Sequence, residues 1–345
     1  MRLWRCLTAL VLALLLTLSV GAAGTAGFSD VPESHWAAQS IRRCAQTGLL
    51  QGVGGGRFGL GRTMTRAAYA TALCRLMGWE LATPEKGSFT DNQDTAKWYY
   101  SAIETAYAHG ALTGESRQCR PNDAITRGEM AKMTVRALGL AVLSGAAADD
   151  CPFSDVSVAQ GYVALAYRMG IIKGVSAYNF EPKKEATREQ AAAVLLRTYD
   201  RLHAAIKVTE AADGSAPSGC VTAGSITEES GSVPVSPRAP MEEVYAAAVR
   251  AGEGGSVALR AVPLLQVTRA GAVTDTRELT EGELIELLSE GTLRTHRSAL
   301  HESSCGYRTE KDGSVTVVWY ESETDIAEKT ELCRLLGIGN VYVLK

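Results

Sequence analysis

The sequence lacks the short motifs by which many enzymes are recognised. It contains no CxxC pair, no nucleophile elbow, no phosphate-binding loop and no HExxH motif. The nearest approach to a metal set, His296, His301 and Cys305, matches no zinc spacing. We therefore expect no catalytic step, no metal and no cofactor, with the enzyme question left open for the C-terminal part.

The sequence also has no excess of basic over acidic residues. Lys+Arg 35 against Asp+Glu 38 gives a net charge of −3, and the charges are interspersed along the chain. Nucleic-acid binding requires a concentrated stripe of Lys and Arg, so we expect no nucleic acid as a partner. The balance is uneven, because residues 28–203 carry 20 basic and 17 acidic residues, whereas residues 204–345 carry 13 and 21.

The first residues have the pattern of a secretory signal peptide. A basic start, Met1 to Arg5, precedes an apolar run from Leu7 to Val20 and a small-residue stretch ending near Gly27. The apolar run is shorter than the roughly 20 residues that span a bilayer. We expect residues 1–26 to be removed, with cleavage after Ala23 or Ala26, leaving a secreted protein without a membrane span.

Export permits disulfides, but seven cysteines remain after the leader, so at least one has no partner within the chain. Cys44, Cys74 and Cys119 fall at positions that are apolar elsewhere in the repeat described below, which favours small buried side chains. A Cys44–Cys74 bridge is the best disulfide candidate. Cys305 and Cys333 could form another, and Cys220 is the best candidate for a free thiol.

A repeat of about 61 residues organises the next part of the chain. The pairs Thr65-Arg66, Thr126-Arg127 and Thr187-Arg188 recur at intervals of 61, and Phe-x-Asp triplets begin ahead of them at Phe28, Phe89 and Phe153. We place the units at residues 28–82, 87–141 and 151–203.

Each unit is predicted to be a helix, a glycine-rich loop and a second helix. In the first unit, Trp36, Ile41, Cys44 and Ala45 have helical spacing and predict one buried stripe, ended by Gly48. The second helix begins at Thr65. Neither helix pair can bury its face alone, so the three units should pack on one another.

The pattern Phe-Ser-Asp-Val, Trp, a glycine-ended helix, Gly-x-Phe and Thr-Arg resembles the S-layer homology (SLH) module, which occurs in three tandem copies. The resemblance implies a mainly α N-terminal half, with three helix-loop-helix modules in a pseudo-threefold spindle. It also implies grooves that bind bacterial cell-wall glycans, either an anionic secondary wall polysaccharide carrying ketal-linked pyruvate or peptidoglycan.

The Thr-Arg pairs predict anion sites. Thr126 and Glu129 form a capping box, Thr187 and Gln190 can do the same, and Thr65 lacks the second half because Ala68 follows it. Each Arg lies in the first helical turn, where the helix dipole and unpaired amides favour an anion. Together with the resemblance, this gives the candidate glycan-binding residues Asp30, Trp36, Arg66, Asp91, Trp98, Arg127, Asp155 and Arg188. The third unit has no Trp, so we expect its groove to be the poorest.

Residues 204–240, which follow the repeats, show no sustained periodicity of apolar residues. Residues 204–240 are predicted to be a linker, and residues 241–345 a small α+β domain. Helices are expected at 241–251, 279–289 and 325–336, and extended segments at 257–268, 315–320 and 341–344. We expect an exported protein anchored non-covalently to the cell wall. The alternatives are a wall-remodelling or carbohydrate-active enzyme that uses the repeats as its anchor, and a structural S-layer subunit.

Overall fold

The computed structural model describes residues 27–114, 116–211, 215–223, 239–298 and 303–345. The predicted signal peptide, residues 1–26, lies outside them, as does His301. Two helices come from each repeat: α2 (Ala38–Gln46) and α3 (Arg66–Met77), α4 (Tyr100–Ala108) and α5 (Arg127–Ala137), α6 (Gln160–Arg168) and α7 (Arg188–Leu202). Two short 3-10 helices, η1 (Leu140–Ser144) and η2 (Ala148–Asp150), join the second unit to the third. Among the described residues, no helix combines the length and apolar character that crossing a bilayer requires.

The helix ends follow the sequence signals. Thr65 caps α3 by accepting a hydrogen bond from Ala68 N, and Thr126 and Glu129 form the predicted capping box of α5. Gly48, Gly110 and Gly170 all have positive φ just after the first helix of their units, a conformation that costs glycine nothing. The predicted stripe of the first helix is correct for Ile41 and Cys44 but wrong for Trp36, which lies before α2 and is 62% exposed.

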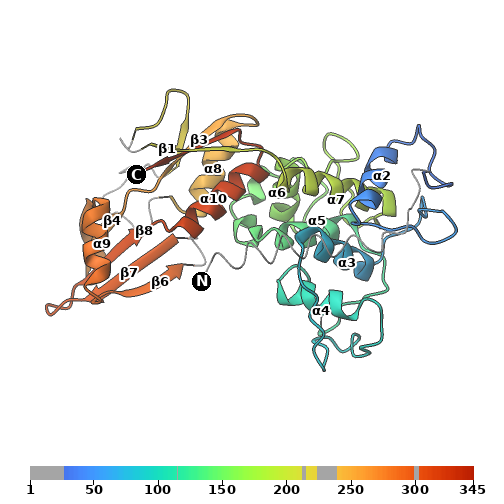
Figure 1. Ribbon diagram of the computed structural model, residues 1–345, viewed down its shortest axis with the longest axis horizontal. Helices are drawn as coiled ribbons and strands as arrows, with labels where there is room; N and C mark the ends of the chain where they lie inside the picture. The colour runs from blue at the N-terminus through green and yellow to red at the C-terminus, as the bar shows by residue number, and fades with distance from the viewer. Residues whose placement is uncertain (1–26, 115, 212–214, 224–238, 299–302) are drawn as a thin grey trace, which may run out of the picture.

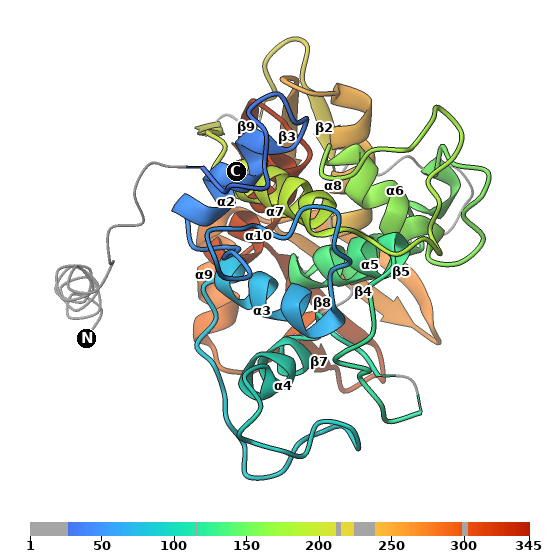
Figure 2. The same ribbon diagram turned by 90° about the vertical axis from the view of Figure 1, so that its right-hand side faces the viewer.

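The two helices of a unit pack on different neighbours. Helix α3 of the first unit lies against α4 of the second, α5 of the second against α6 of the third, and α7 of the third against α2 of the first. Figure 2 shows the pairs α3/α4, α5/α6 and α2/α7 pointing in different directions around a common centre. Each unit therefore donates one helix to each of two pairs, which confirms that the units cannot bury their faces alone.

This exchange overturns the predicted disulfide. Cys44 lies on α2 and donates its thiol to the carbonyl of Ala192 on α7, whereas Cys74 on α3 donates to the carbonyl of Ala102 on α4. Both thiols are buried and free. Cys305 and Cys333 are likewise free, and Cys220 is a free thiol as expected.

The centre is closed by a ring of backbone hydrogen bonds. Met64 N donates to Ala186 O, Ala186 N to Ile125 O, and Ile125 N to Met64 O, each at 2.8 Å. Each of these residues lies two positions before the first residue of a Thr-Arg helix, and their side chains are almost fully buried. Short antiparallel bridges flank the ring: Thr63 with Thr187, Thr65 with Ala124, and Thr126 with Glu185.

The C-terminal part contains two sheets. The parallel sheet has the order β1-β9-β3-β2, formed by β1 (Lys207–Ala211), β9 (Asn340–Leu344), β3 (Ser256–Arg260) and β2 (Val221–Ala223). The antiparallel sheet has the order β5-β4-β8-β7-β6, formed by β5 (Ala272–Glu278), β4 (Leu264–Arg269), β8 (Val315–Tyr320), β7 (Ser303–Thr309) and β6 (Arg294–Ser298). The helices are α8 (Met241–Ala251), α9 (Glu281–Ser289) and α10 (Glu323–Leu335).

The prediction that this part combines strands and helices is confirmed, but strands β5, β6 and β7 were not predicted. Two further expectations need correction. The expected linker, residues 204–240, contributes β1 and β2, whose partners β9 and β3 lie far away in sequence. The expected extended segment 257–268 is divided into β3 and β4, which belong to different sheets.

The C-terminal part is packed directly on the third unit. Helices α8 and α10 cover the parallel sheet and contact η1 and α7, so that they lie between the strands and the N-terminal helices (Figure 1). Their buried side chains, including Val244, Leu332 and Leu335, are continuous with the core of the repeats. Across this boundary Tyr245 Oη donates to Asp150 Oδ2 at 2.7 Å, and Arg201 pairs with Glu253 at 2.7 Å.

The core shared by the repeats and the C-terminal part predicts how a substitution at the boundary changes stability. Tyr245→Ala should lower the free energy of unfolding by roughly 3–5 kcal/mol, because it removes a buried aromatic side chain and a hydrogen bond at the boundary. Hydrogen exchange should show protection falling together in α6 and α8. Tyr307→Ala, at an exposed position of β7, serves as the control. Loss of protection confined to residues 239–345 would contradict a shared core.

Candidate functional site

Three arginines that start the second helices hold the units together. Arg66 Nε donates to Cys119 O, Arg127 Nε to Phe180 O and Arg188 Nε to Phe58 O, at 2.8–3.0 Å. Each arginine therefore reaches from its own unit to the loop of the next. The guanidinium groups of Arg127 and Arg188 also lie over the rings of Phe180 and Phe58, at 4.5 and 4.8 Å. The predicted anion-binding arginines thus have a structural role.

The three predicted aspartates organise the same loops from the other side. Asp30 accepts hydrogen bonds from the backbone N–H groups of Phe58, Gly59 and Leu60 at 2.7–3.0 Å. Asp91 accepts from Cys119 N and Arg120 N, and Asp155 from Phe180 N and Glu181 N. Each aspartate fixes the loop whose carbonyl receives an arginine of the preceding unit. Glycan contact by these aspartates stays a prediction.

These contacts shift the acidity of the aspartates. Partial desolvation raises the pKa of Asp30, but the N–H groups of Leu60, Phe58 and Gly59 outweigh it and hold this pKa below its ordinary value. The pKa values of Asp91 and Asp155 are lowered in the same way, again against desolvation. All three carboxylates therefore stabilise the fold in their charged form.

A groove lies between the second and third units, and we call it the Arg127 groove. It has a volume of about 270 Å³. Arg127 comes from α5, Lys173 and Val175 come from the loop of the third unit, and Arg197 comes from α7. Trp36 of the first unit also lines it. The groove is thus assembled from all three units, with an exposed indole at one wall.

The guanidinium groups give this groove positive charge, and Asp155 and Glu181 attract Arg127 electrostatically. Arg127 donates to the carbonyl oxygens of Phe180 and Lys173, and Arg197 Nη1 donates to Ile171 O at 3.2 Å. In the part of the chain that the structure describes, neither guanidinium forms an ion pair. Burial lowers the pKa of both arginines, as expected for cations that are partly removed from water.

A second, smaller groove of about 40 Å³ is formed by Arg66 and the second unit, and we call it the Arg66 groove. It is lined by Arg66, Ala111, Thr113, Glu129, Lys132, Met133 and Arg136. Tyr162 of the third unit lies beside this groove. Arg136 Nη1 donates to the Tyr162 hydroxyl at 3.4 Å, and Lys132 Nζ lies over the Tyr162 ring, 5.9 Å from its centre. The aromatic side chain here contacts the groove's own cations.

The structure brings Trp36 and Arg127 together in one groove and places Arg66 in another. Arg188 donates to Gln51 O at 2.7 Å and lies in neither, and Trp98, 66% exposed, lines neither. The expectation that the third unit forms the poorest groove differs from the geometry, because its loop and α7 build the larger cavity and the first unit supplies the Trp. Whether the grooves differ in glycan binding stays a prediction.

Sequence reasoning missed Lys173, Arg197 and Arg136. A signal for the arginines was present, since Arg75, Arg136 and Arg197 recur at intervals of 61 residues, each nine positions after the Thr-Arg arginine. Two of them make equivalent contacts, Arg136 Nε to Gly110 O and Arg197 Nη1 to Ile171 O. Lys173 has no such repeat, and only the folded loop places it beside Arg127.

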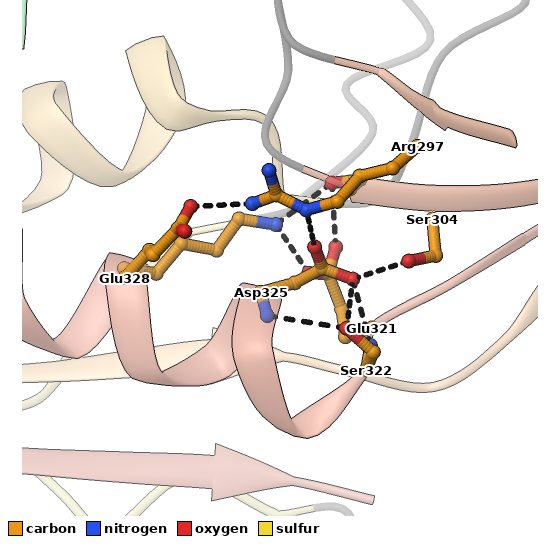
Figure 3. Close-up of polar contacts among 8 residues, drawn as sticks. Arg297, Ser304, Glu321, Ser322, Asp325 and Glu328 are labelled. Atoms are coloured by element: carbon orange, nitrogen blue, oxygen red, sulfur yellow. Dashed lines mark hydrogen bonds and ion pairs between the residues drawn. The ribbon is translucent and has the colours of Figure 1, made fainter. Parts of the chain in front are cut away.

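A separate polar cluster lies in the C-terminal part, where α10 meets β6 and β7 (Figure 3). Asp325 accepts from Arg297 Nε at 2.8 Å and from Ser304 Oγ and Ser322 Oγ at 2.7 Å. Beside it, Lys329 Nζ contacts Glu321 and donates to Ser303 Oγ at 2.8 Å. Burial raises the pKa of Glu321 to about 7, against the attraction of Lys329. Lys329 is 1% exposed, so its contacts with Glu321 and Ser303 lie inside the protein and connect α10 to β7.

Comparison with known proteins identifies the repeats. The family model of the S-layer homology domain matches residues 27–70, 88–131 and 152–192, which confirms the resemblance found in the sequence. An amylopullulanase of Thermoanaerobacterium thermosulfurigenes is 33% identical over 179 residues, 49% of this chain and 9% of that protein. An S-layer protein of Bacillus thuringiensis subsp. finitimus is 30% identical over 197 residues, 56% of this chain and 24% of that protein.

A third relative, the S-layer protein sap of Bacillus anthracis, is 31% identical over 183 residues, 52% of this chain and 22% of that protein. The matches thus span less than a quarter of the length of each of these three relatives. Among solved structures, the spore cortex-lytic enzyme SleL of Bacillus cereus covers 37% of this chain and 31% of its own at 12% identity, with a TM-score of 0.31. A likeness that low carries no structural argument.

The aspartate contacts predict a pH-dependent contribution to stability. Asp30→Asn should lower the free energy of unfolding by roughly 1–2 kcal/mol at pH 7, because charged acceptors make stronger hydrogen bonds than neutral ones. The folded-state pKa is lowered, so this contribution is present above the unfolded pKa and is lost as the pH falls through the folded value.

Urea unfolding over a series of pH values from 7 downward measures this contribution. The stabilities of the two proteins should converge as the pH falls through the folded-state pKa of Asp30. Glu33→Gln, in an exposed ion pair with Arg42, is the control and should change stability little. A penalty of equal size at every pH value would show that Asp30 acts through shape alone.

Proposed function

We propose that the three tandem S-layer homology domains of this chain hold an exported protein at the bacterial cell surface, by non-covalent binding of an anionic wall polysaccharide in the Arg127 groove. The observation that carries the proposal is the combination, in one cavity, of an exposed indole with guanidinium groups that form no ion pair among the described residues. Relatives named as S-layer and cell surface proteins support attachment at the surface.

The groove has two kinds of wall, and both bear on the ligand. Arg127, Arg197 and Lys173 supply positive charge, which a carboxylate can neutralise through charge-assisted hydrogen bonds. Ile172, Val175 and Val194 supply apolar surface beside them. A ketal-linked pyruvate carries a carboxylate and a methyl group on one carbon, so it matches both. Trp36 offers a flat face for the attached sugar ring.

We also propose that the domains form the pseudo-threefold spindle implied by the resemblance. Support comes from the ring that joins Met64, Ile125 and Ala186 and from the cyclic exchange of helices between units. In such an arrangement, each groove draws on the Thr-Arg helix of one unit and on the loop and second helix of the next.

For the C-terminal part, residues 241–345, we propose no reaction. The alternative from the sequence, a wall-remodelling or carbohydrate-active enzyme, is tested by incubating the full chain with wall sacculi and measuring released reducing ends. Release above that from a heat-denatured sample would favour the enzyme.

Trp36→Ala tests the groove. The full chain should co-sediment with wall sacculi, and the variant should bind at least tenfold more weakly, because a stacking face is lost. Its stability should change little, since Trp36 is largely exposed. Trp98→Ala is the matched control, equally exposed but outside both described grooves, and should weaken binding less than threefold.

Acid extraction of the sacculi separates the two wall components. Binding should disappear with the extracted secondary polymer. Binding that survives extraction unchanged would assign peptidoglycan as the partner instead. Equal losses in the two Trp variants would contradict the Arg127 groove as the binding site.

A further inference from the structure

The two grooves differ at several equivalent positions, since Lys132 and Met133 of the Arg66 groove correspond to Ala193 and Val194 of the Arg127 groove. Another such position lies three residues after the capping threonine. That residue is Glu129 in the Arg66 groove and Gln190 in the Arg127 groove. Both fulfil the same capping role, because Glu129 Oε2 accepts from Thr126 N at 2.9 Å and Gln190 Oε1 accepts from Thr187 N at 3.2 Å. They differ in charge, so the capping role alone does not determine which of them occurs.

The second oxygen of Glu129 is turned to the arginines of its groove. Glu129 Oε1 accepts from Arg66 Nη1 at 2.7 Å and from Arg120 Nη2 at 2.8 Å. The side chain of Arg66 is only 7% exposed, so this ion pair is shielded from water. A carboxylate of the protein itself therefore lies where the equivalent arginine of the other groove faces a cavity.

In the Arg127 groove no described carboxylate forms an ion pair with Arg127, although Asp155 and Glu181 attract it electrostatically. Gln190 is neutral, and Glu181, the counterpart of Arg120, pairs with Lys184 at 2.7 Å. The Nε and Nη2 atoms of Arg127 donate to carbonyl oxygens, which do not neutralise its charge. The cavities also differ in volume, at about 270 Å³ against about 40 Å³.

We propose that Glu129 acts as a built-in anion that closes the Arg66 groove to the wall polymer, and that the neutral Gln190 leaves the Arg127 groove open. The residue at this position of the second helix thereby determines which groove accepts a carboxylate. This inference rests on the proposed function, since it presupposes that the ligand is anionic.

The physical reason is competition for the same donors. A ligand carboxylate entering the Arg66 groove would meet the negative charge of Glu129 and would have to separate it from both arginines. Breaking a shielded ion pair leaves an uncompensated charge, and the exposed interaction that the ligand forms in return does not offset that cost. In the Arg127 groove a carboxylate has no ion pair of the two arginines to break among the described residues, and it neutralises cations that burial already disfavours.

Two reciprocal substitutions test this in the full chain. Gln190→Glu places the carboxylate of the Arg66 groove in the Arg127 groove, and Glu129→Gln removes it from the Arg66 groove. Each new residue can still cap its helix, as the other unit demonstrates. Arg66 keeps its bond to Cys119 O in the second variant, as Arg127 keeps its bond to Phe180 O in the native groove. Gln190→Ala is a neutral control.

The probe is the methyl glycoside of a hexosamine carrying a ketal-linked pyruvate, titrated calorimetrically beside the same glycoside with its carboxylate as a methyl ester. For the acidic probe we expect Gln190→Glu to bind with one site fewer, or at least tenfold more weakly, and Gln190→Ala to lose less than threefold. Glu129→Gln should gain one site. The ester should bind weakly to every variant.

Undiminished binding by Gln190→Glu, or an unchanged number of sites in Glu129→Gln with retained helical circular dichroism, would overturn the inference while the proposed function stands. Failure of the wild-type chain to bind both the acidic probe and native sacculi would instead overturn the proposed function.

Discussion

The N-terminal half depends on closure of one ring. Met64, Ile125 and Ala186 exchange backbone hydrogen bonds in a cycle, and the second helix of every unit starts immediately after its member of the ring. A cycle has no free end, so removing one unit leaves unpaired backbone groups in the other two. Buried, unpaired backbone groups are costly. The ring therefore makes the three repeats interdependent, unlike the open stacks of most repeat proteins.

Closure also explains why the Thr-Arg pair recurs so regularly. Capping accounts for the threonine, and the arginine carries the connection from unit to unit through the carbonyls of Cys119, Phe180 and Phe58. Regular recurrence of these arginines is thus required by the fold before any ligand is considered. Function enters through what surrounds the arginine, which differs between units: Glu129 and Arg120 in one groove, Gln190 and the indole of Trp36 in another.

Local sequence signals predicted much of this structure, whereas contacts between segments far apart in the sequence could not be predicted. The 61-residue spacing, the caps and the positive-φ glycines located the helices of the repeats to within a few residues. The exchange of helices between units has no signature within a single unit. The sequence therefore predicts a Cys44–Cys74 bridge, whereas the two thiols contact different helices, α7 and α4. Strands β1 and β2 were missed because their segments have no periodicity and find their partners, β9 and β3, far away along the chain.

The sequence predicted the arginines and the indole of the candidate site. It did not predict that they lie together, because that depends on how the three units pack.

Helix α7 connects this site to the rest of the molecule. It has 15 residues, whereas α3 has 12 and α5 has 11. Its middle carries Arg197 into the Arg127 groove, and its last turn carries Arg201, which bonds to Met169 O and to Glu253 of the C-terminal part.

One rigid helix thus contacts both the proposed polymer site and the base of the C-terminal sheets, where α10 also packs on it. A polymer held in the Arg127 groove would therefore fix the direction in which the C-terminal part points from the wall. A flexible linker could not impose such a direction, and the strands found in the segment expected to be one, β1 and β2, belong to the packed structure.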